Sequence, residues 1–271
     1  MNSNMLFDLA TVALFSSVAM LLTWEWQRRT RNAGFVDITW AGCLAFAALF
    51  YGAIGEGALL PRLLVAVLGA VWGFRLANHL LARVLNESED GRYKFLRGHW
   101  KDSQFKFFLF FQGQVVLVLL FSVPFYLAAQ NPESNFTIWY ALGLLNWIVS
   151  IAGEATADRQ LASFRHDTRN RGKTCRAGLW RYSRHPNYFF EWLHWFTYVF
   201  LAIGAPMGWL ALIGPAVMLT TLCWVTGIPF VEAQSIRSRG DDYREYQRTT
   251  SALIPWFPKP SLEASRPVNP P

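Results

Sequence analysis

One short stretch of the chain, residues 178–195, combines ionisable side chains with a strongly apolar run. It opens with basic and hydroxyl side chains and continues into an apolar segment that carries Asn187, Glu191 and His194. Pro186 fits the first turn of a helix, because the N–H that proline lacks would have no intrahelical partner there. From that start the three polar residues recur at i, i+4 and i+7, on one helix face. The spacing therefore predicts a helix that begins near Pro186 and presents three polar groups to a polar partner.

Two motifs in this half of the chain resemble a known superfamily. The string Arg184-His185-Pro186-Asn187-Tyr188, followed by Glu191, resembles the C-terminal segment of the steroid 5-alpha-reductase and sterol C14/C7-reductase superfamily. Downstream, Asp242-Tyr243-Arg244-Glu245-Tyr246 and Ala252-Leu253-Ile254-Pro255 are similar to the closing segment of that superfamily. The nearest resemblance is to its DUF1295 branch. The shorter Arg-His-Pro-x-Tyr core also occurs in isoprenylcysteine carboxyl methyltransferases, which bind S-adenosylmethionine.

The resemblance to the reductases implies an NADPH site at the cytosolic side. The residues that it assigns to cofactor binding are Asn86, Arg92, Asp158, Arg165, Lys173, Arg181, Tyr182, Arg184, His185, Asn187, Tyr188, Glu191, Glu232, Tyr243 and Tyr246. Residues 159–184 form a basic loop with eight Lys or Arg residues. Because arginine binds phosphate in a bidentate manner, one or two of these residues would bind the 2′-phosphate of NADPH. The chain has no G-x-G-x-x-G motif, so a soluble Rossmann domain is excluded as the cofactor site.

Each of these assignments has a simpler alternative. The positive charge of the loop after residue 158 is also explained by membrane topology alone. His185 and Asn187 alternatively only cap the helix that follows them. The loop that carries Asn86 is alternatively a solvated turn. Tyr243 and Tyr246 lie on a predicted short amphipathic segment, whose alternative role is anchoring at the membrane interface.

The predicted catalytic residues are Asp37 and Tyr93. In the reductase family an acidic residue of the second span polarises the substrate carbonyl together with a tyrosine, and Asp37 matches that acid in position. The position of the family's tyrosine in the third span holds Arg75 here, which is a departure from the family pattern. Because an ionisable group inside a span costs at least about 2.5 kcal/mol, both groups need partners. The alternative to catalysis is a structural ion pair between Asp37 and Arg75.

The composition is that of a membrane protein. Of the 271 residues, 53% are hydrophobic and 16% are charged, against about 25% charged in soluble domains. The net charge of +7 comes from basic residues in loops between apolar runs, so we expect no nucleic-acid partner. The partners that we expect are membrane lipids and a lipophilic small-molecule substrate from the bilayer.

The apolar runs predict an all-α, polytopic integral membrane bundle of about seven transmembrane helices. The predicted spans are 5–26, 35–54, 59–84, 105–128, 137–156, 187–204 and 207–228. We expect one transmembrane domain over residues 1–257. The Pro- and Ser-containing tail at 258–271 has no apolar periodicity, so it is predicted to be disordered.

Metal and disulfide chemistry are not indicated. Cys43, Cys175 and Cys223 are isolated in the sequence, without a C-x-x-C pair. The five histidines form no H-x-x-x-H or H-x-x-H-H box, which disfavours the di-iron class. We therefore expect no metal site.

These observations favour a membrane-embedded reductase that uses NADPH to reduce an activated C=C bond of a lipophilic substrate. The first alternative is a membrane methyltransferase that uses S-adenosylmethionine, since it shares the Arg-His-Pro-x-Tyr core. The second alternative is a lipid-binding membrane protein without catalysis. The sequence leaves the substrate and the oligomeric state open.

The first testable prediction concerns topology. The four basic clusters follow the first, third, fifth and seventh predicted spans, and basic residues accumulate on the cytosolic side. A reporter fused after Pro258 is therefore expected in the cytosol, and a reporter in the loop 129–136 is expected on the opposite side. Reversed reporter signals would overturn the orientation.

Overall fold

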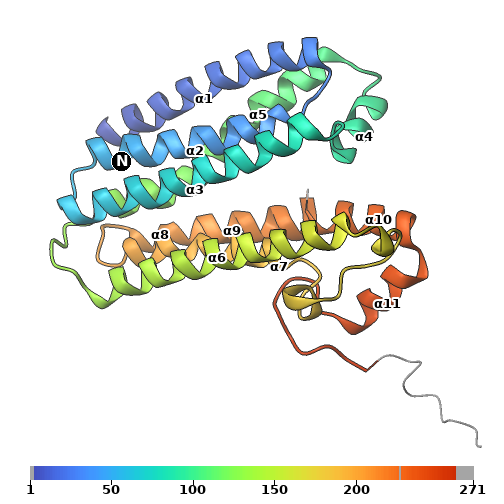
Figure 1. Ribbon diagram of the computed structural model, residues 1–271. Helices are drawn as coiled ribbons and strands as arrows, with labels where there is room; N and C mark the ends of the chain where they lie inside the picture. Colours follow the sequence, from blue (N-terminus) through green and yellow to red (C-terminus); the bar gives the residue numbers. More distant parts are fainter. Residues whose placement is uncertain (1–2, 226, 261–271) are drawn as a thin grey trace, which may run out of the picture. The chain divides into compact units, whose positions relative to one another are not determined.

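The computed structural model describes residues 3–225 and 227–260, and every regular element in this part of the chain is a helix (Figure 1). The elements in chain order are α1 (Ser3–Thr30), α2 (Phe35–Ile54), α3 (Leu59–Asn86), α4 (Gly91–His99), α5 (Gln104–Ala129), α6 (Ile138–His166), η1 (Thr168–Asn170), η2 (Gly178–Arg181), α7 (Pro186–His194), α8 (Phe196–Leu201), η3 (Gly208–Leu212), α9 (Ile213–Thr220), η4 (Thr221–Val225), α10 (Ile228–Arg239) and α11 (Asp241–Thr249). The predicted all-α fold class is confirmed.

Six segments of the described chain are long and apolar enough to cross a membrane. They are Met5–Thr30, Phe35–Ile54, Leu59–Asn86, Gln104–Ala129, Ile138–His166 and Gly208–Arg239. These match six of the predicted spans within a few residues at most of their ends, although the fifth and the last extend further toward the C-terminus. The predicted span at 187–204 differs, because it consists of the two short helices α7 and α8. The two helices are separated at Trp195, whose backbone amide donates to the carbonyl of Trp192 at 3.3 Å.

The described residues group into two compact units, and the single transmembrane domain over residues 1–257 stays a prediction. Of the described residues, those up to Leu144 together with Phe196–Val217 form the first unit, and Leu145–Trp195 together with the described residues from Met218 onward form the second. The predicted disordered tail, 258–271, lies outside the described residues from position 261 onward. Each unit is described by itself below.

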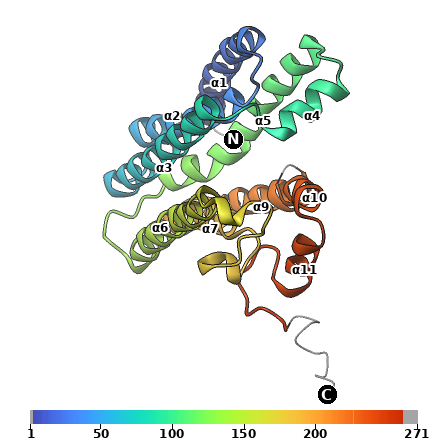
Figure 2. The same ribbon diagram turned by 45° about the vertical axis from the view of Figure 1, so that its right-hand side comes forward.

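In the first unit, α2 and α3 pack closely through small residues, and the two helices lie side by side in both views (Figures 1 and 2). The small residues at this contact are Ala41, Ala45, Ala48 and Gly52 of α2, with Ala66, Gly69 and Gly73 of α3. Small side chains let helix backbones approach closely inside a membrane, where apolar burial gives little drive for association. The composition of both helices therefore explains why they pair.

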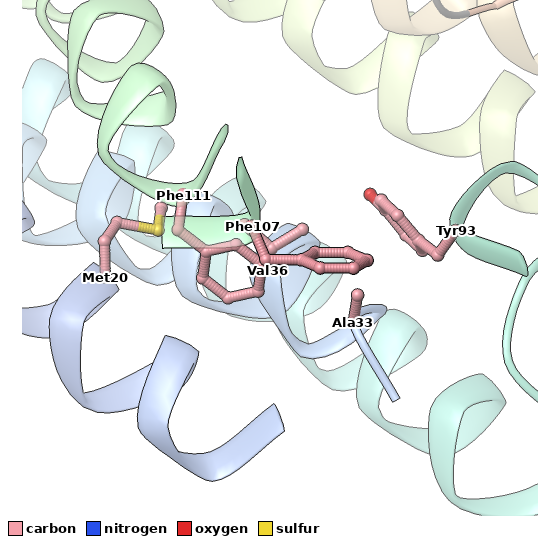
Figure 3. Packing of buried hydrophobic residues seen from close by; sticks show 6 residues of the cluster. All are labelled: Met20, Ala33, Val36, Tyr93, Phe107 and Phe111. Carbon is pink, nitrogen blue, oxygen red and sulfur yellow. The ribbon is translucent and has the colours of Figure 1, made fainter. Parts of the chain in front are cut away.

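The helix α4 closes one end of the first unit. Asp90 caps it by accepting a 2.9 Å hydrogen bond from the amide of Arg92, which is the usual role of an aspartate at this position. The ring of Tyr93 belongs to a buried cluster with five side chains from α1, the connection between α1 and α2, the start of α2, and α5 (Figure 3). The cluster consists of Met20, Ala33, Val36, Tyr93, Phe107 and Phe111. This packing fixes the ring of Tyr93 and thereby the position of its hydroxyl group.

In the second unit, α6 supports a loop that leads to α7. Helix α7 begins at Pro186, as predicted from the sequence. The side-chain nitrogen Nδ2 of Asn146 in α6 donates to the backbone carbonyl of Leu193 in α7 at 2.8 Å. Helix α11 is amphipathic and buries both of its tyrosines. The unit thus gathers both motifs that resembled the reductase superfamily.

The second prediction tests the contact between α2 and α3. A Cβ atom at Gly69 would lie 2.4 Å from Cβ of Ala48, so Gly69→Ala must move backbone rather than a flexible side chain. Overpacking of this kind costs about 1–3 kcal/mol, and we expect a lower thermal midpoint in detergent. The matched control is Gly113→Ala in α5, where the added methyl meets nothing within 4 Å. Equal midpoints for the two variants would contradict the close helix contact.

Candidate functional site

The loop before α7 is held in place by the C-terminal half of α6. The side-chain oxygen of Gln160 accepts from the amide of Leu179 at 2.9 Å, and the indole of Trp180 donates to the carbonyl of Ala157 at 2.9 Å. Gly178 has a φ of +59°, and a Cβ atom there would lie 2.4 Å from the Gln160 amide group. Glycine is required at this position because it adopts positive φ without strain and leaves room for Gln160. These contacts set the direction in which the following residues enter the site.

The centre of the second unit is the carboxylate of Glu232 in α10. Its Oε1 atom accepts from Nε of Arg184 at 2.6 Å and contacts Nε2 of His185 at 3.2 Å. Its Oε2 atom accepts from the side chain of Gln247 at 2.8 Å. The hydroxyl of Tyr243 is a weaker donor to Oε1, at 3.4 Å. One carboxylate therefore joins the loop before α7 to α10 and α11.

Arg184 is mostly used for internal contacts. Besides Glu232, its Nη1 atom donates to the carbonyls of Gln247 at 2.9 Å and Thr250 at 2.7 Å. Within the described chain, Nη2 has no hydrogen-bond partner, and the side chain as a whole is 11% exposed. The geometry gives Arg184 a large structural role beside the predicted cofactor role.

His185 is buried, and burial lowers the pKa of its imidazole below the usual range. The contact between Nε2 of His185 and the Glu232 carboxylate requires a proton on Nε2, because the carboxylate is an acceptor. The ring also stacks on Tyr188, with 5.4 Å between centroids and 11° between planes. His185 is thus a neutral side chain of fixed tautomer inside the unit.

The closing motif runs beside the loop before α7. Tyr246 donates to the carbonyl of Ser183 at 3.0 Å and also to the carbonyl of Trp180. Ser183 donates in turn to the carbonyl of Leu253 at 2.7 Å. Tyr243 is 3% exposed and Tyr246 is 2% exposed, so the alternative that they anchor an amphipathic segment at the membrane interface is wrong. Burial raises the pKa of both phenols, which stay neutral donors.

The other predicted cofactor residues of the second unit lie around this frame. Asn187 donates to Asp158 at 3.1 Å, which links α7 to α6. Glu191 lies on α7, and Arg165 lies in the last turn of α6. Lys173 and Tyr182 are exposed. Arg181 and Tyr182 make a cation–π contact of 6.0 Å.

A groove of about 570 Å³ opens along α6 and the loop after it. Its lining residues include Thr156, Arg159, Gln160, Ser163, Asp167 and Asn170. Ligand sites commonly have volumes of about 300–1,000 Å³. The donors on this wall are a guanidinium, hydroxyls and amides, which suit phosphate and ribose oxygens. These donors match the oxygens of a dinucleotide in kind, but the wall also carries the Asp167 carboxylate, and the described lining contains none of the predicted cofactor residues.

In the first unit, the structure brings the two predicted catalytic residues together. The hydroxyl of Tyr93 donates to Oδ1 of Asp37 at 2.7 Å, and Nη2 of Arg92 lies 3.1 Å from Oδ2. Asp90 binds Arg92 at 3.2 Å and Arg83 at 2.7 Å, which extends the network to α3. Burial and the Asp37 carboxylate raise the pKa of Tyr93 well above its usual range, so its hydroxyl stays protonated. The result is a neutral phenol and a guanidinium on one carboxylate.

The alternative to catalysis was a structural ion pair between Asp37 and Arg75, and this partner is wrong. Asp37 pairs with Arg92 of α4, and not with Arg75 of α3. Spacing along the sequence could not reveal this, because α4 returns to the start of α2 through tertiary contacts. Asn86 ends α3, and its side-chain nitrogen donates to the carbonyl of Ala82 at 2.7 Å.

Sequence reasoning missed several residues that hold these sites. In the second unit they are Gln160, Trp180, Ser183 and Gln247. In the first unit Glu89 was missed: it accepts from Arg97 at 2.7 Å and from the amide of Ala33 at 2.8 Å. No motif marked these positions. The only signal was weak: Glu89 and Arg97 are eight residues apart beside a short helix, which is compatible with an ion pair. Among the residues that the structure describes, no group of three metal-ligating side chains occurs.

The helices and their apolar spans define the class: this chain is a multi-pass helical membrane protein. Residues 23–250 match the family described as protein of unknown function (DUF1295), and the chain belongs to that family. The uncharacterized protein C594.04c of Schizosaccharomyces pombe is 28% identical over 237 residues, which cover 74% of this chain and 69% of the relative. No solved structure matches the chain. Membership of the DUF1295 family is thus confirmed, whereas the resemblance to the reductase superfamily stays a prediction.

The third prediction tests Glu232 as the structural centre of the second unit. Glu232→Gln removes the negative charge and leaves the Arg184 guanidinium, whose side chain is only 11% exposed, without its counter-ion. Breaking a buried ion pair costs about 3–5 kcal/mol, so we expect a large fall of the thermal midpoint in detergent. The control is Asp241→Asn, which weakens an exposed pair with Arg244 and is expected to cost less than about 1 kcal/mol. Similar midpoints for both variants would contradict the central role of Glu232.

Proposed function

We propose that this protein is an NADPH-dependent reductase of an activated C=C bond in a lipophilic substrate. The observation that carries the proposal is the 2.7 Å hydrogen bond between Tyr93 and Asp37, with Arg92 on the same carboxylate. A carboxylate with a phenol and a guanidinium offers two donors for a substrate carbonyl oxygen. In the resembling reductases an acidic residue and a tyrosine polarise the substrate carbonyl, so the pairing supports the same role here.

The proposed step is a conjugate reduction. NADPH would supply a hydride to the β-carbon of an α,β-unsaturated carbonyl compound. The electron pair of the C=C bond then shifts toward the carbonyl, and the oxygen gains negative charge. Tyr93 and Arg92 stabilise that charge by donating hydrogen bonds, which is electrostatic stabilisation of the transition state. A proton from water at the α-carbon completes the saturated product.

The hydroxyl of Tyr93 must change its partner during this step. It has one proton and donates it to Asp37. Rotation of the hydroxyl would let it donate to the substrate oxygen, while Arg92 remains the counter-ion of Asp37. The raised pKa of Tyr93 keeps the proton on the phenol at neutral pH. The phenol therefore acts as a hydrogen-bond donor rather than as a base.

The second unit supplies the proposed cofactor contacts. We assign the phosphate and ribose contacts to the wall that contains Arg159, Gln160 and Asn170, together with the exposed Lys173. The free Nη2 donor of Arg184 is a further contact. The other side-chain partners of Glu232, which are His185, Tyr243 and Gln247, make internal contacts in this unit and do not themselves need to touch the cofactor.

The fourth prediction tests cofactor and chemistry with separate readouts. The purified protein should be stabilised against heat by NADPH more than by NADH, because a native-state ligand stabilises according to its affinity. A tenfold preference for NADPH corresponds to about 1.4 kcal/mol. Tyr93→Phe keeps the ring in its buried cluster, so it should keep the NADPH-induced shift. Its NADPH oxidation with a panel of lipophilic enones should fall by about 10²-fold or more.

The matched control is Tyr140→Phe. Tyr140 is also buried in the first unit and donates to the carbonyl of Glu133 at 2.9 Å, so this variant loses one hydrogen bond away from Asp37. We expect it to keep turnover. Stabilisation by S-adenosylmethionine and not by NADPH would favour the methyltransferase alternative. No shift with either cofactor, and no oxidation with any enone, would favour the lipid-binding alternative.

A further inference from the structure

The segment 250–259 follows α11 and is fixed by its main chain. We call it the C-terminal hook; it is the last coloured part of the chain in Figure 2. The carbonyl of Ser251 accepts from the amide of Arg184 at 2.8 Å, and the amide of Trp256 donates to the carbonyl of Tyr182 at 2.9 Å. The amide of Lys259 donates to the carbonyl of Thr249 at 2.8 Å. The hook therefore keeps a defined path without burying most of its side chains.

Large apolar side chains of the hook are exposed. Ile254 is 57% exposed, Trp256 is 71% exposed and Phe257 is 79% exposed, whereas Leu253 is buried. Phe257 meets only the edge of Tyr182, with 6.1 Å between ring centroids. Three such side chains within four positions form an apolar patch that needs a partner. The main-chain hydrogen bonds of the hook hold these three side chains at the protein surface.

Basic side chains border the same patch. A pocket of about 330 Å³ is lined by Arg176, Arg181, Glu245, Thr249, Thr250, Pro258 and Lys259. Its acidic member, Glu245, is paired with Arg248 at 2.6 Å, and Arg176 is paired with Asp242 at 2.7 Å. In the described part of the chain, Arg181 and Lys259 form no ion pair. The border of the patch therefore carries uncompensated positive charge.

We propose that the C-terminal hook is a membrane-interface element. It inserts Ile254, Trp256 and Phe257 at the headgroup level of an anionic bilayer, while Arg181 and Lys259 bind lipid phosphates. Tryptophan beside basic residues is typical of the membrane–water interface. Basic residues near an anionic leaflet add further attraction. The partner is therefore the surface of the same membrane that the helices cross.

The position of the hook in its unit supports this partner. The hook is bonded to Tyr182 and Arg184 of the loop before α7. That loop is bonded to Gln160 in the last turns of α6, which is one of the candidate spans. A segment tied to the end of a membrane-spanning helix lies near the bilayer surface. The inference does not depend on NADPH or on any reaction.

The fifth prediction locates the hook with a fluorescent probe in the full-length protein. Cys223 is replaced by alanine, because Cys43 and Cys175 are buried. Phe257→Cys is labelled with an environment-sensitive fluorophore, and the protein is placed in nanodiscs of phosphatidylcholine with or without phosphatidylglycerol. Shallow spin-labelled lipids should quench the probe, and phosphatidylglycerol should increase the quenching. Labelled Cys223→Ala protein without Phe257→Cys gives the background.

The matched control is the same label at Asp241→Cys. Asp241 belongs to the same unit, its side chain is 94% exposed at the start of α11, and it is not one of the three apolar side chains of the patch. We expect little quenching there by lipid and strong quenching by a water-soluble quencher. If the probe at position 257 is quenched by the water-soluble quencher and not by the spin-labelled lipids, the hook faces water and the proposal is wrong.

A second variant tests the charge at the border. Lys259→Gln in the Phe257→Cys background should lose part of the gain in quenching that phosphatidylglycerol causes, while quenching in phosphatidylcholine remains. An unchanged gain would remove the phosphate contact from Lys259. Because position 257 is exposed, the labelled variants should keep the thermal midpoint of the parent protein.

Discussion

The second unit of this protein depends on the carboxylate of Glu232. Four side chains from two other segments converge on its two oxygens. The Glu232 side chain is only 13% exposed, and a charge so largely removed from water needs partners of this kind, because the loss of hydration is otherwise uncompensated. The two sequence motifs that resemble the reductases are thus joined physically: Arg184 comes from the first motif, Tyr243 comes from the second, and both contact Glu232 of α10.

This arrangement divides the motif residues by role. His185 and Tyr246 are buried and have internal partners, so they shape the unit. Lys173 and Arg181 remain available at its surface. A substitution in the first group would change stability and ligand binding together, whereas one in the second group would change binding alone. Stability and affinity therefore need to be measured side by side for every residue of these motifs.

The first unit follows a different constraint. Its α2 and α3 helices pair through small residues, and polar side chains gather where α4 closes one end. There Asp37 combines with Tyr93 and Arg92, while Glu89 binds Arg97 and the main chain before α2. An ionic network of this kind holds a short helix that has little apolar surface. It also fixes the donors to which we assign the proposed chemistry.

The sequence by itself determined the membrane class, most span boundaries, the helix start at Pro186 and membership of the DUF1295 family. These features depend on local composition and on the spacing of apolar and polar residues, which the chain displays directly. Only the tertiary structure decided that Asp37 pairs with Arg92 rather than Arg75, and that the tyrosines of α11 are buried while Trp256 is exposed. Such outcomes depend on which distant segments meet, and periodicity within one segment does not specify the partner of a side chain. The same reason explains why Glu232 was predicted as a ligand contact, whereas the folded chain shows it as the centre of an internal network.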